Sequence, residues 1–279
     1  MLRVIQISDT HLSRQTQAFA GNWPPLAAWI AAQRPDLVIH TGDLTVDGAD
    51  TEDDLVHCAG LLRGLGLPYR TAPGNHDVGD AGHEHQPVDA IRLGRWQHHF
   101  GPDRWVEDVE GWRLIGFDAM LIGSGVSEEG AQLAWLDEAM QAAAGRRLAW
   151  FLHKPLFLKA PDEGDTGYWS VKPEPRRPLV ELVRRHRVAL VASGHLHKAR
   201  DFVCDGTRYI WCPSSAFLCG PSVQAEMPGD KYLGAVSYEF DGDDVRAGIV
   251  AVPGLTAHWI DPVIEQVYPL HLDSRPAGK

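Results

Sequence analysis

The sequence contains no apolar run long enough to cross a membrane, and no basic cluster beyond pairs such as Arg146-Arg147 and Arg184-Arg185. A membrane-spanning helix needs about 20 consecutive apolar residues. The formal net charge of −11 also argues against a nucleic-acid polymer, because such ligands are held by a basic face that displaces their counterions. We therefore expect neither a membrane nor a nucleic-acid polymer as a partner. A small phosphorylated substrate is compatible with this charge if bound metal supplies positive charge locally.

Cysteine is scarce, and the spacing of the cysteines indicates no metal-binding motif. The four cysteines, Cys58, Cys204, Cys212 and Cys219, form no C-x-x-C pair and no zinc-finger pattern. The chain begins on a strand-like run rather than on a charged and then apolar signal segment. We therefore expect reduced, packed thiols in a cytoplasmic protein.

Strand-like apolar runs alternate with helical patterns along most of the chain, which predicts an α/β protein. The expected strands are Leu2–Ile7, Leu37–Asp43, Leu67–Thr71, Trp112–Met120, Leu148–Leu152, Val188–Ala192, Tyr209–Trp211, Leu233–Phe240 and Val245–Val252. The expected helices are Pro24–Arg34, Asp50–Gly64, Ala131–Ala144 and Arg177–Arg187. Residues 78–108 are rich in His, Gly and Pro and are expected to be irregular.

Polar side chains follow five of these strands at the point where each strand ends. They are Asp9 and His11, Asp43, Asn75 with His76 and Asp77, His153, and His195 with His197. In open α/β sheets ligands bind at the carboxyl edge of the strands, so these side chains are expected in one cleft. Each cluster alone is equally typical of an ordinary polar turn. Their repetition at the same position of successive strands favours a common site.

The mixture of imidazole, carboxylate and amide oxygen in these clusters suits Fe, Mn, Zn or Co. The candidate ligands are too many for one ion, and the carboxylates are too few for a calcium cage. Two ions that share Asp43 fit the number of ligands. Such ions would lie about 3.5–4 Å apart and clamp the attacking and leaving oxygens of an in-line displacement. A hydroxide held between them would be the nucleophile, because metal binding lowers the pKa of water to about 7.

These motifs, in this order, resemble those of the calcineurin-like metallophosphoesterase superfamily. The resemblance extends from residue 9 to residue 197 and implies a four-layer α/β/β/α sandwich with the metals at the strand ends. It predicts a single metallophosphoesterase domain over residues 1–252, with residues 253–279 as an extension packed on the surface. By the same resemblance, one ion would be held by Asp9, His11 and His197 and the other by Asn75, His153 and His195, with Asp43 bridging them.

The resemblance also implies roles beyond metal binding. His76 is similar to the family histidine that contacts the phosphate and protonates the leaving oxygen, and Asp77 is expected to orient its ring. Asn75, His76 and His197 are expected to contact the substrate. The protein phosphatases and dinucleoside tetraphosphate hydrolases of the superfamily carry phosphate-binding arginines at two positions. This sequence has Pro73 at one of them and the stretch after Asp43 at the other, so both arginines are missing.

This departure, together with the stretch Thr41–Thr45, resembles the bacterial class III cyclic nucleotide phosphodiesterases and glycerophosphodiesterases. We therefore expect a dinuclear metal-dependent phosphodiesterase acting on a small phosphodiester. The alternatives are a phosphomonoesterase on the same site, a nuclease of the superfamily, or a catalytically inactive interaction module. The sequence leaves the oligomeric state open, with a homodimer as one option.

Overall fold

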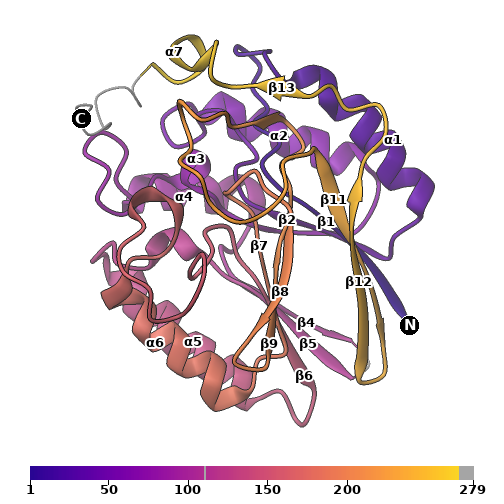
Figure 1. Cartoon of the computed structure of the whole chain (residues 1–279), viewed down its shortest axis with the longest axis vertical. Helices are drawn as coiled ribbons and strands as arrows, with labels where there is room; N and C mark the ends of the chain where they lie inside the picture. The colour runs from indigo at the N-terminus through magenta and orange to yellow at the C-terminus, as the bar shows by residue number, and fades with distance from the viewer. Residues whose placement is uncertain (110, 270–279) are drawn as a thin grey trace.

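Two β-sheets packed face to face form the centre of the computed structural model, which describes residues 1–109 and 111–269 (Figure 1). The first sheet has the strand order β12-β11-β1-β2-β3. Its strands are β1 (Leu2–Ile7), β2 (Leu37–Thr41), β3 (Tyr69–Ala72), β11 (Gly234–Asp241) and β12 (Asp244–Ala251). Strands β1, β2 and β3 run parallel, whereas β11 pairs antiparallel with both of its neighbours.

The second sheet has the strand order β4-β5-β6-β7-β9-β8, with parallel pairing from β5 to β9. Its strands are β4 (Trp105–Val109), β5 (Trp112–Gly116), β6 (Arg147–Phe151), β7 (Leu190–Ser193), β8 (Arg200–Cys204) and β9 (Thr207–Trp211). A separate short pair joins β10 (Phe217–Leu218) to β13 (His258–Trp259) in parallel. Val4 and Ile39 of the first sheet pack with Leu114 and Phe151 of the second in one buried cluster, which fixes the sandwich.

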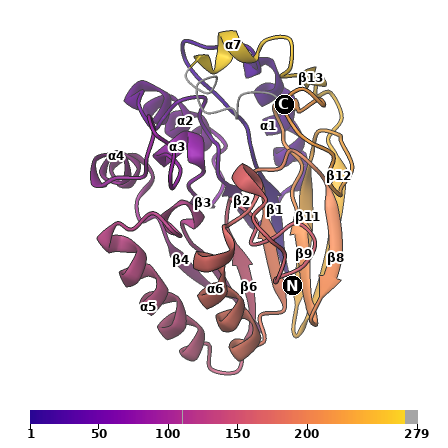
Figure 2. The ribbon, with the colours of Figure 1, turned by 60° about the vertical axis from the view of Figure 1, so that its left-hand side comes forward.

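Helices surround the two sheets. They are α1 (Trp23–Gln33), α2 (Glu52–Gly64), α3 (Asn75–Val78), α4 (Ala90–Phe100), α5 (Ser127–Gln141), α6 (Pro173–His186) and α7 (Ile264–Val267), with short 3-10 turns η1 (Ala20–Asn22), η2 (Ala119–Leu121) and η3 (Gly167–Trp169). Leu26 and Ile30 of α1 pack under the first sheet, whereas Leu136 of α5 and Leu179 of α6 pack under the second. Figure 2 shows α5 and α6 together, well apart from α1. The predicted four-layer α/β/β/α sandwich is confirmed.

The prediction that residues 78–108 are irregular was wrong, because this stretch contains α4 and the start of β4. Asp89 caps α4 by accepting a hydrogen bond from the backbone N–H of Arg92, and Leu93 and Trp96 are its buried side chains. Leu93, Trp96 and Phe100 recur at helical spacing, a signal that the prediction from the His, Gly and Pro content of residues 78–108 did not use. The edge strand β8 was also missed, because it is short and half exposed.

The segment after β12 crosses from the sandwich to the end that carries α7 (Figure 1). It was expected to pack on the surface, yet Ile260, Val267 and Tyr268 are buried in one cluster with Phe19 and Phe217. Residues 270–279 of the predicted extension lie outside the described residues. No helix in residues 1–109 and 111–269 is long and apolar enough to cross a membrane.

Candidate metal centre

The strand-end loops of both sheets meet at one edge of the sandwich. The backbone N–H of Asp9, after β1, donates to the carbonyl of Gly42, after β2. In the second sheet, the N–H of Gly194, after β7, donates to the carbonyl of His153, after β6. The N–H of His195 then donates to Asp9 Oδ2 at 3.0 Å, which joins the loops of the two sheets directly. All seven predicted metal ligands are buried at this junction.

The backbone at this junction is strained. Five of the seven predicted ligands have left-handed backbone conformations, with φ between 41° and 68°: Asp9, His11, Asp43, His195 and His197. Conformations of this kind cost about 1–3 kcal/mol each in residues other than glycine and persist where the surrounding structure enforces them. They turn each side chain from its strand end toward the junction. Such clustering of strain is typical of a functional site.

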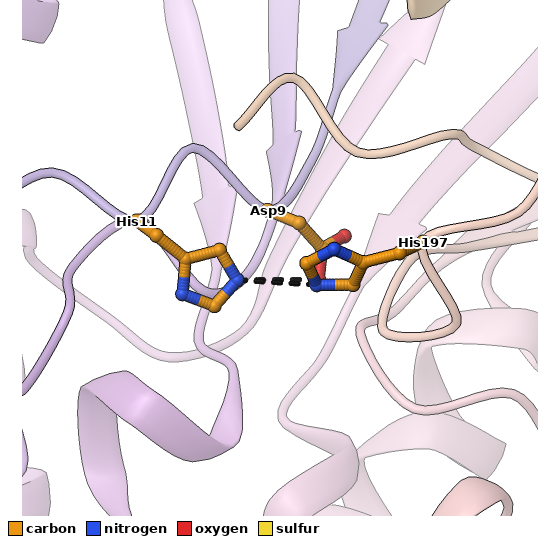
Figure 3. A group of neighbouring side chains, drawn as sticks. All are labelled: Asp9, His11 and His197. Atoms are coloured by element: carbon orange, nitrogen blue, oxygen red, sulfur yellow. Dashed lines mark hydrogen bonds and ion pairs between the residues drawn. The ribbon is translucent and has the colours of Figure 1, made fainter. Parts of the chain in front are cut away.

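The first group of converging side chains consists of Asp9, His11 and His197, which point toward one another in Figure 3. The Nε2 atoms of His11 and His197 lie 3.2 Å apart, and His197 Nε2 lies 3.2 Å from Asp9 Oδ1. His197 Nδ1 lies 2.8 Å from the Phe217 carbonyl, which can only accept, so His197 Nε2 carries a lone pair. No described residue donates a hydrogen bond to Asp9 Oδ1, although this atom is fully buried.

The second group consists of Asp43, Asn75, His153 and His195. His153 Nε2 lies 3.2 Å from Asn75 Oδ1, from His195 Nδ1 and from Asp43 Oδ2. The opposite ring nitrogens donate to carbonyls, His153 Nδ1 to Thr41 at 2.7 Å and His195 Nε2 to Tyr168 at 3.0 Å. The Asn75 amide N–H donates to Tyr168 Oη at 2.8 Å, which leaves its oxygen facing the group.

Both groups therefore gather acceptor atoms in excess of donors, and in the second group a proton on His153 is what can balance the Asp43 carboxylate. A buried polar atom without a hydrogen-bond partner destabilises the folded state by about 1–3 kcal/mol, and a charged atom does so by more. A cation in each group would satisfy every one of these atoms. Metal-ligating atoms about 2.1 Å from one ion lie roughly 3.0–3.4 Å apart. The 3.2 Å contacts in both groups match this spacing, whereas His11 Nε2 and Asp9 Oδ1 are wider apart, at 3.9 Å. Asp43 Oδ2 also lies 3.8 Å from His11 Nε2, so Asp43 is the residue common to both groups. The residues fit the predicted pair of metal ions.

The protonation states of the histidines suit metal binding. Burial lowers the pKa of His11 and of His195 well below the ordinary value, so both rings are neutral. His153 differs: burial lowers its pKa, but the Asp43 carboxylate outweighs burial and raises the pKa to about 9. Burial would raise the pKa of Asp43, but His153, His76 and His11 outweigh burial and hold this pKa well below its usual range. In the metal-free chain a proton on His153 thus stands where a cation would otherwise lie.

Metal affinity is consequently expected to rise with pH. Below its pKa of about 9, His153 must release a proton before it can bind metal, whereas Asp43 is already ionised. One proton released when the ion of the second group binds predicts that the affinity of this group increases about tenfold per pH unit. Calorimetric titration with Mn²⁺ at pH values from about 6.5 to 8.5, in buffers of different ionisation enthalpy, measures both the slope and the proton count. Affinity independent of pH would contradict this account.

His76 lies beside the first group, with potential ligand atoms of His11, Asp43 and His76 within 4.8 Å of one another. Its Nδ1 donates to the Val46 carbonyl at 3.0 Å, and its backbone N–H donates to Asp43 Oδ1 at 2.9 Å. The ring is buried and its centroid lies 5.0 Å from that of His11. This position suits contact with a substrate bound at the metals.

Asp77 has a different role from the one predicted. Its carboxylate accepts from the backbone N–H groups of Leu44, Thr45 and Gly74 and from the Thr45 hydroxyl at 2.7 Å. These bonds cap the start of α3 and tie it to the loop after β2. The ring of His76 is instead oriented by the Val46 carbonyl. Asp77 therefore supports the loop that carries Asp43.

Two tyrosines at the site were not predicted. Tyr168 belongs to η3, between β6 and α6, and contacts Asn75 and His195. Tyr268 belongs to the C-terminal segment, and its Oη lies 2.7 Å from His11 Nδ1. The sequence contained Tyr168 next to Trp169 in a loop beside a cleft, a weak signal for a site residue. Tyr268 had no such signal.

Glycines allow the loops to approach this closely. A Cβ atom at Gly74 would lie 2.3 Å from both the backbone nitrogen and Oδ1 of Asp43. Overpacking of this kind costs about 1–3 kcal/mol. Gly74→Ala is therefore expected to lower the free energy of unfolding by about 2 kcal/mol and to weaken Mn²⁺ binding, as measured by denaturant unfolding and calorimetry.

Gly60 offers a matched control, because a Cβ there would meet open space on the exposed face of α2. Gly60→Ala is expected to raise the free energy of unfolding by about 0.5–1 kcal/mol and to leave metal binding unchanged. If Gly74→Ala behaved like Gly60→Ala, the close approach of the two loops would be contradicted.

The sequence model of the calcineurin-like phosphoesterase family matches residues 2–199. A probable cyclic nucleotide phosphodiesterase of Synechococcus sp. is 27% identical over 270 residues, which cover 93% of each chain. A probable glycerophosphodiester phosphodiesterase, GpdQ, of Arcobacter nitrofigilis is 27% identical over 217 residues, 70% of this chain and 71% of the relative.

A solved structure shares the fold. The purple acid phosphatase PPD1 of yellow lupin aligns with a TM-score of 0.64 and 14% identity, covering all of this chain and 57% of the other. The family match includes every predicted metal ligand, from Asp9 to His197. The chain therefore belongs to the calcineurin-like phosphoesterase family, whose named members among these relatives are hydrolases of phosphoric esters.

Proposed function

We propose that the protein is a dinuclear metal-dependent phosphodiesterase that hydrolyses a small phosphodiester, such as a cyclic nucleotide or a glycerophosphodiester. The observation that carries this proposal is the pair of acceptor groups joined through Asp43. Asp9, His11 and His197 would hold one ion, and Asn75, His153 and His195 the other. When bound, the two ions would neutralise phosphate charge and lower the pKa of water.

The surrounding residues have distinct parts in this proposal. His76 would contact the phosphate and give a proton to the leaving oxygen, since its ring is buried beside the first group. The Asn75 amide and His197 are the other proposed substrate contacts. The strained loops keep the ligands fixed in advance, so little reorganisation would accompany the reaction.

The charges around the site are compatible with a diester, which needs less neutralisation than a monoester. In residues 1–109 and 111–269, no arginine or lysine side chain is hydrogen-bonded to any of the seven proposed ligands. Lys154, next to His153, is paired instead with Asp80 at 2.7 and 2.8 Å. A monoester carries about −1.5 to −2 charges at pH 7, and a diester only one. Two relatives named as phosphodiesterases support the same choice.

A substrate panel tests the proposal. The Mn²⁺-reconstituted protein would be assayed with 3′,5′- and 2′,3′-cyclic nucleotides, glycerophosphodiesters, phosphomonoesters and bis(p-nitrophenyl) phosphate. We expect kcat/KM to be higher for diesters than for the matching monoesters, and activity to disappear after chelation. Hydrolysis of monoesters alone would point to a phosphomonoesterase. A protein that binds two ions and hydrolyses none of these substrates would contradict the proposal.

A further inference from the structure

The C-terminal segment brings one side chain into the metal centre. Tyr268 is buried, its Oη lies 2.7 Å from His11 Nδ1, and its ring centroid lies 4.6 Å from that of His76. This residue lies outside the part of the chain that matches the family model. The segment therefore adds to the centre something that the family motifs do not contain.

The four proposed histidine ligands differ in what holds the ring nitrogen that faces away from the metal. Three of them use backbone carbonyls: Thr41 for His153 at 2.7 Å, Phe217 for His197 at 2.8 Å and Tyr168 for His195 at 3.0 Å. For His11 the corresponding atom is the Tyr268 hydroxyl, a side-chain group. Among these four contacts, it is the one that a substitution can remove without changing the backbone.

The direction of this hydrogen bond follows from the position of the other ring nitrogen. His11 Nε2 faces His197 Nε2 at 3.2 Å and the Asp43 carboxylate at 3.8 Å. For Nε2 to offer a lone pair to a cation, the proton of the neutral ring must be on Nδ1. In that tautomer His11 Nδ1 donates and Tyr268 Oη accepts. Partners of this kind fix both the tautomer and the orientation of a ligand.

We propose that Tyr268 is a positioning residue for the first metal ion: it accepts the His11 Nδ1 proton in a hydrogen bond and thereby directs Nε2 toward the ion. This inference rests on the proposed metal centre. It makes the C-terminal segment a part of the active site rather than a surface extension.

The segment that carries Tyr268 is anchored to the same strand that supports the first group. Strand β13 pairs with β10, and the N–H of Ile260 donates to the Leu218 carbonyl at 3.0 Å. Tyr268 is buried in one cluster with Phe19, Val46 and Phe217. Phe217 also supports both histidines of the group, because its carbonyl accepts from His197 and its ring lies 4.7 Å from that of His11. The packing of this segment thus fixes the Tyr268 hydroxyl beside His11 before any ion binds.

The variant Tyr268→Phe tests the role of the hydroxyl while keeping the aromatic ring against His76. We expect calorimetric titration with Mn²⁺ to show about 10–100-fold weaker binding at one of two sites, with the other unchanged. At saturating Mn²⁺ the kcat of the variant should return to the wild-type value, since the hydroxyl acts through His11. Tyr209→Phe is the matched control, because Tyr209 is a buried tyrosine that packs on Phe157 and Phe202. It should bind both ions as the wild type does.

The outcomes separate this inference from the proposed function. If the wild type binds two ions and Tyr268→Phe binds both with unchanged affinity, the inference is overturned and the proposed function stands. Equal weakening in Tyr268→Phe and Tyr209→Phe would also overturn it, since general destabilisation would explain both. A wild-type chain that binds no metal would overturn the proposed function and this inference together.

Discussion

Asp43→Asn is expected to abolish tight binding of both metal ions and to reduce phosphodiester hydrolysis more than about 100-fold. Asp43 belongs to both groups, with Oδ2 at 3.2 Å from His153 Nε2 and 3.8 Å from His11 Nε2. Removal of an outer partner of a metal ligand already costs about 10–100-fold in affinity or activity, so loss of a shared charged ligand should exceed that. Metal content after dialysis and kcat/KM on bis(p-nitrophenyl) phosphate measure the two effects.

Asp43→Asn is also expected to change the pKa of His153, which can be measured in the metal-free protein. The Asp43 carboxylate is what raises the pKa of His153 against the effect of burial. In Asp43→Asn burial remains and the carboxylate is lost, so the pKa of His153 should fall and its ring should be neutral at pH 7. An NMR titration of the histidine resonances in the metal-free protein reports this directly.

Asp54→Asn is the control for removing a buried carboxylate elsewhere. Asp54 lies at the start of α2, is buried, and accepts from the backbone N–H of Arg14 rather than facing either group. It should keep two bound ions and wild-type activity. Retention of one tightly bound ion in Asp43→Asn would show that the two groups are independent, and would contradict a shared ligand.

The convergence of the proposed ligands was predictable because it follows from local pattern and sheet topology. Each ligand follows a strand, and parallel pairing of β1 with β2 and of β6 with β7 brings the ends of those strands to one edge. Nothing further is needed to bring Asp43 near Asp9, or His153 near His195. The left-handed φ angles at five of these positions were not predictable, because residues other than glycine adopt them only uncommonly, even though aspartate and histidine do so more readily than most.

The role given to Asp77 failed for a geometric reason. Adjacent residues in a helix point about 100° apart, so His76 and Asp77 in α3 cannot direct their side chains at the same place. The family resemblance suggested a partnership that the helix forbids. Asp77 instead turns back toward the start of its own helix, where unpaired backbone N–H groups lie.

Tyr268 could not be predicted, because its partner His11 is 257 residues away and no motif surrounds it. A contact of this kind depends on the path of the whole C-terminal segment, which is set by the pairing of β13 with β10 and by packing around Phe217. Periodicity reports on neighbours in sequence and contains no information about such a path. Residues outside the motifs are therefore where this site departs most from its sequence prediction.

His76→Ala is expected to lower kcat by about 10²–10⁴-fold and to leave two metal ions bound, because general acid catalysis contributes an effect of this size. The imidazole is buried beside His11, with Nδ1 fixed on the Val46 carbonyl. If His76 were instead a ligand, a role that its closeness to His11 and Asp43 permits, the variant would lose metal. Metal analysis of the purified variant separates these two roles.

The choice of leaving group tests the proton transfer itself. An alcohol released from a glycerophosphodiester or a cyclic nucleotide is a poor leaving group and needs protonation, whereas p-nitrophenolate departs without it. His76→Ala should therefore lose far more activity on the first two substrates than on bis(p-nitrophenyl) phosphate. Equal losses on all three, with metal content unchanged, would mean that His76 binds the phosphate and transfers no proton. If His76 is the acid, His76→Gln, which keeps a hydrogen-bond donor but cannot give up a proton, should have a lower KM than His76→Ala without recovering kcat on the poor leaving groups.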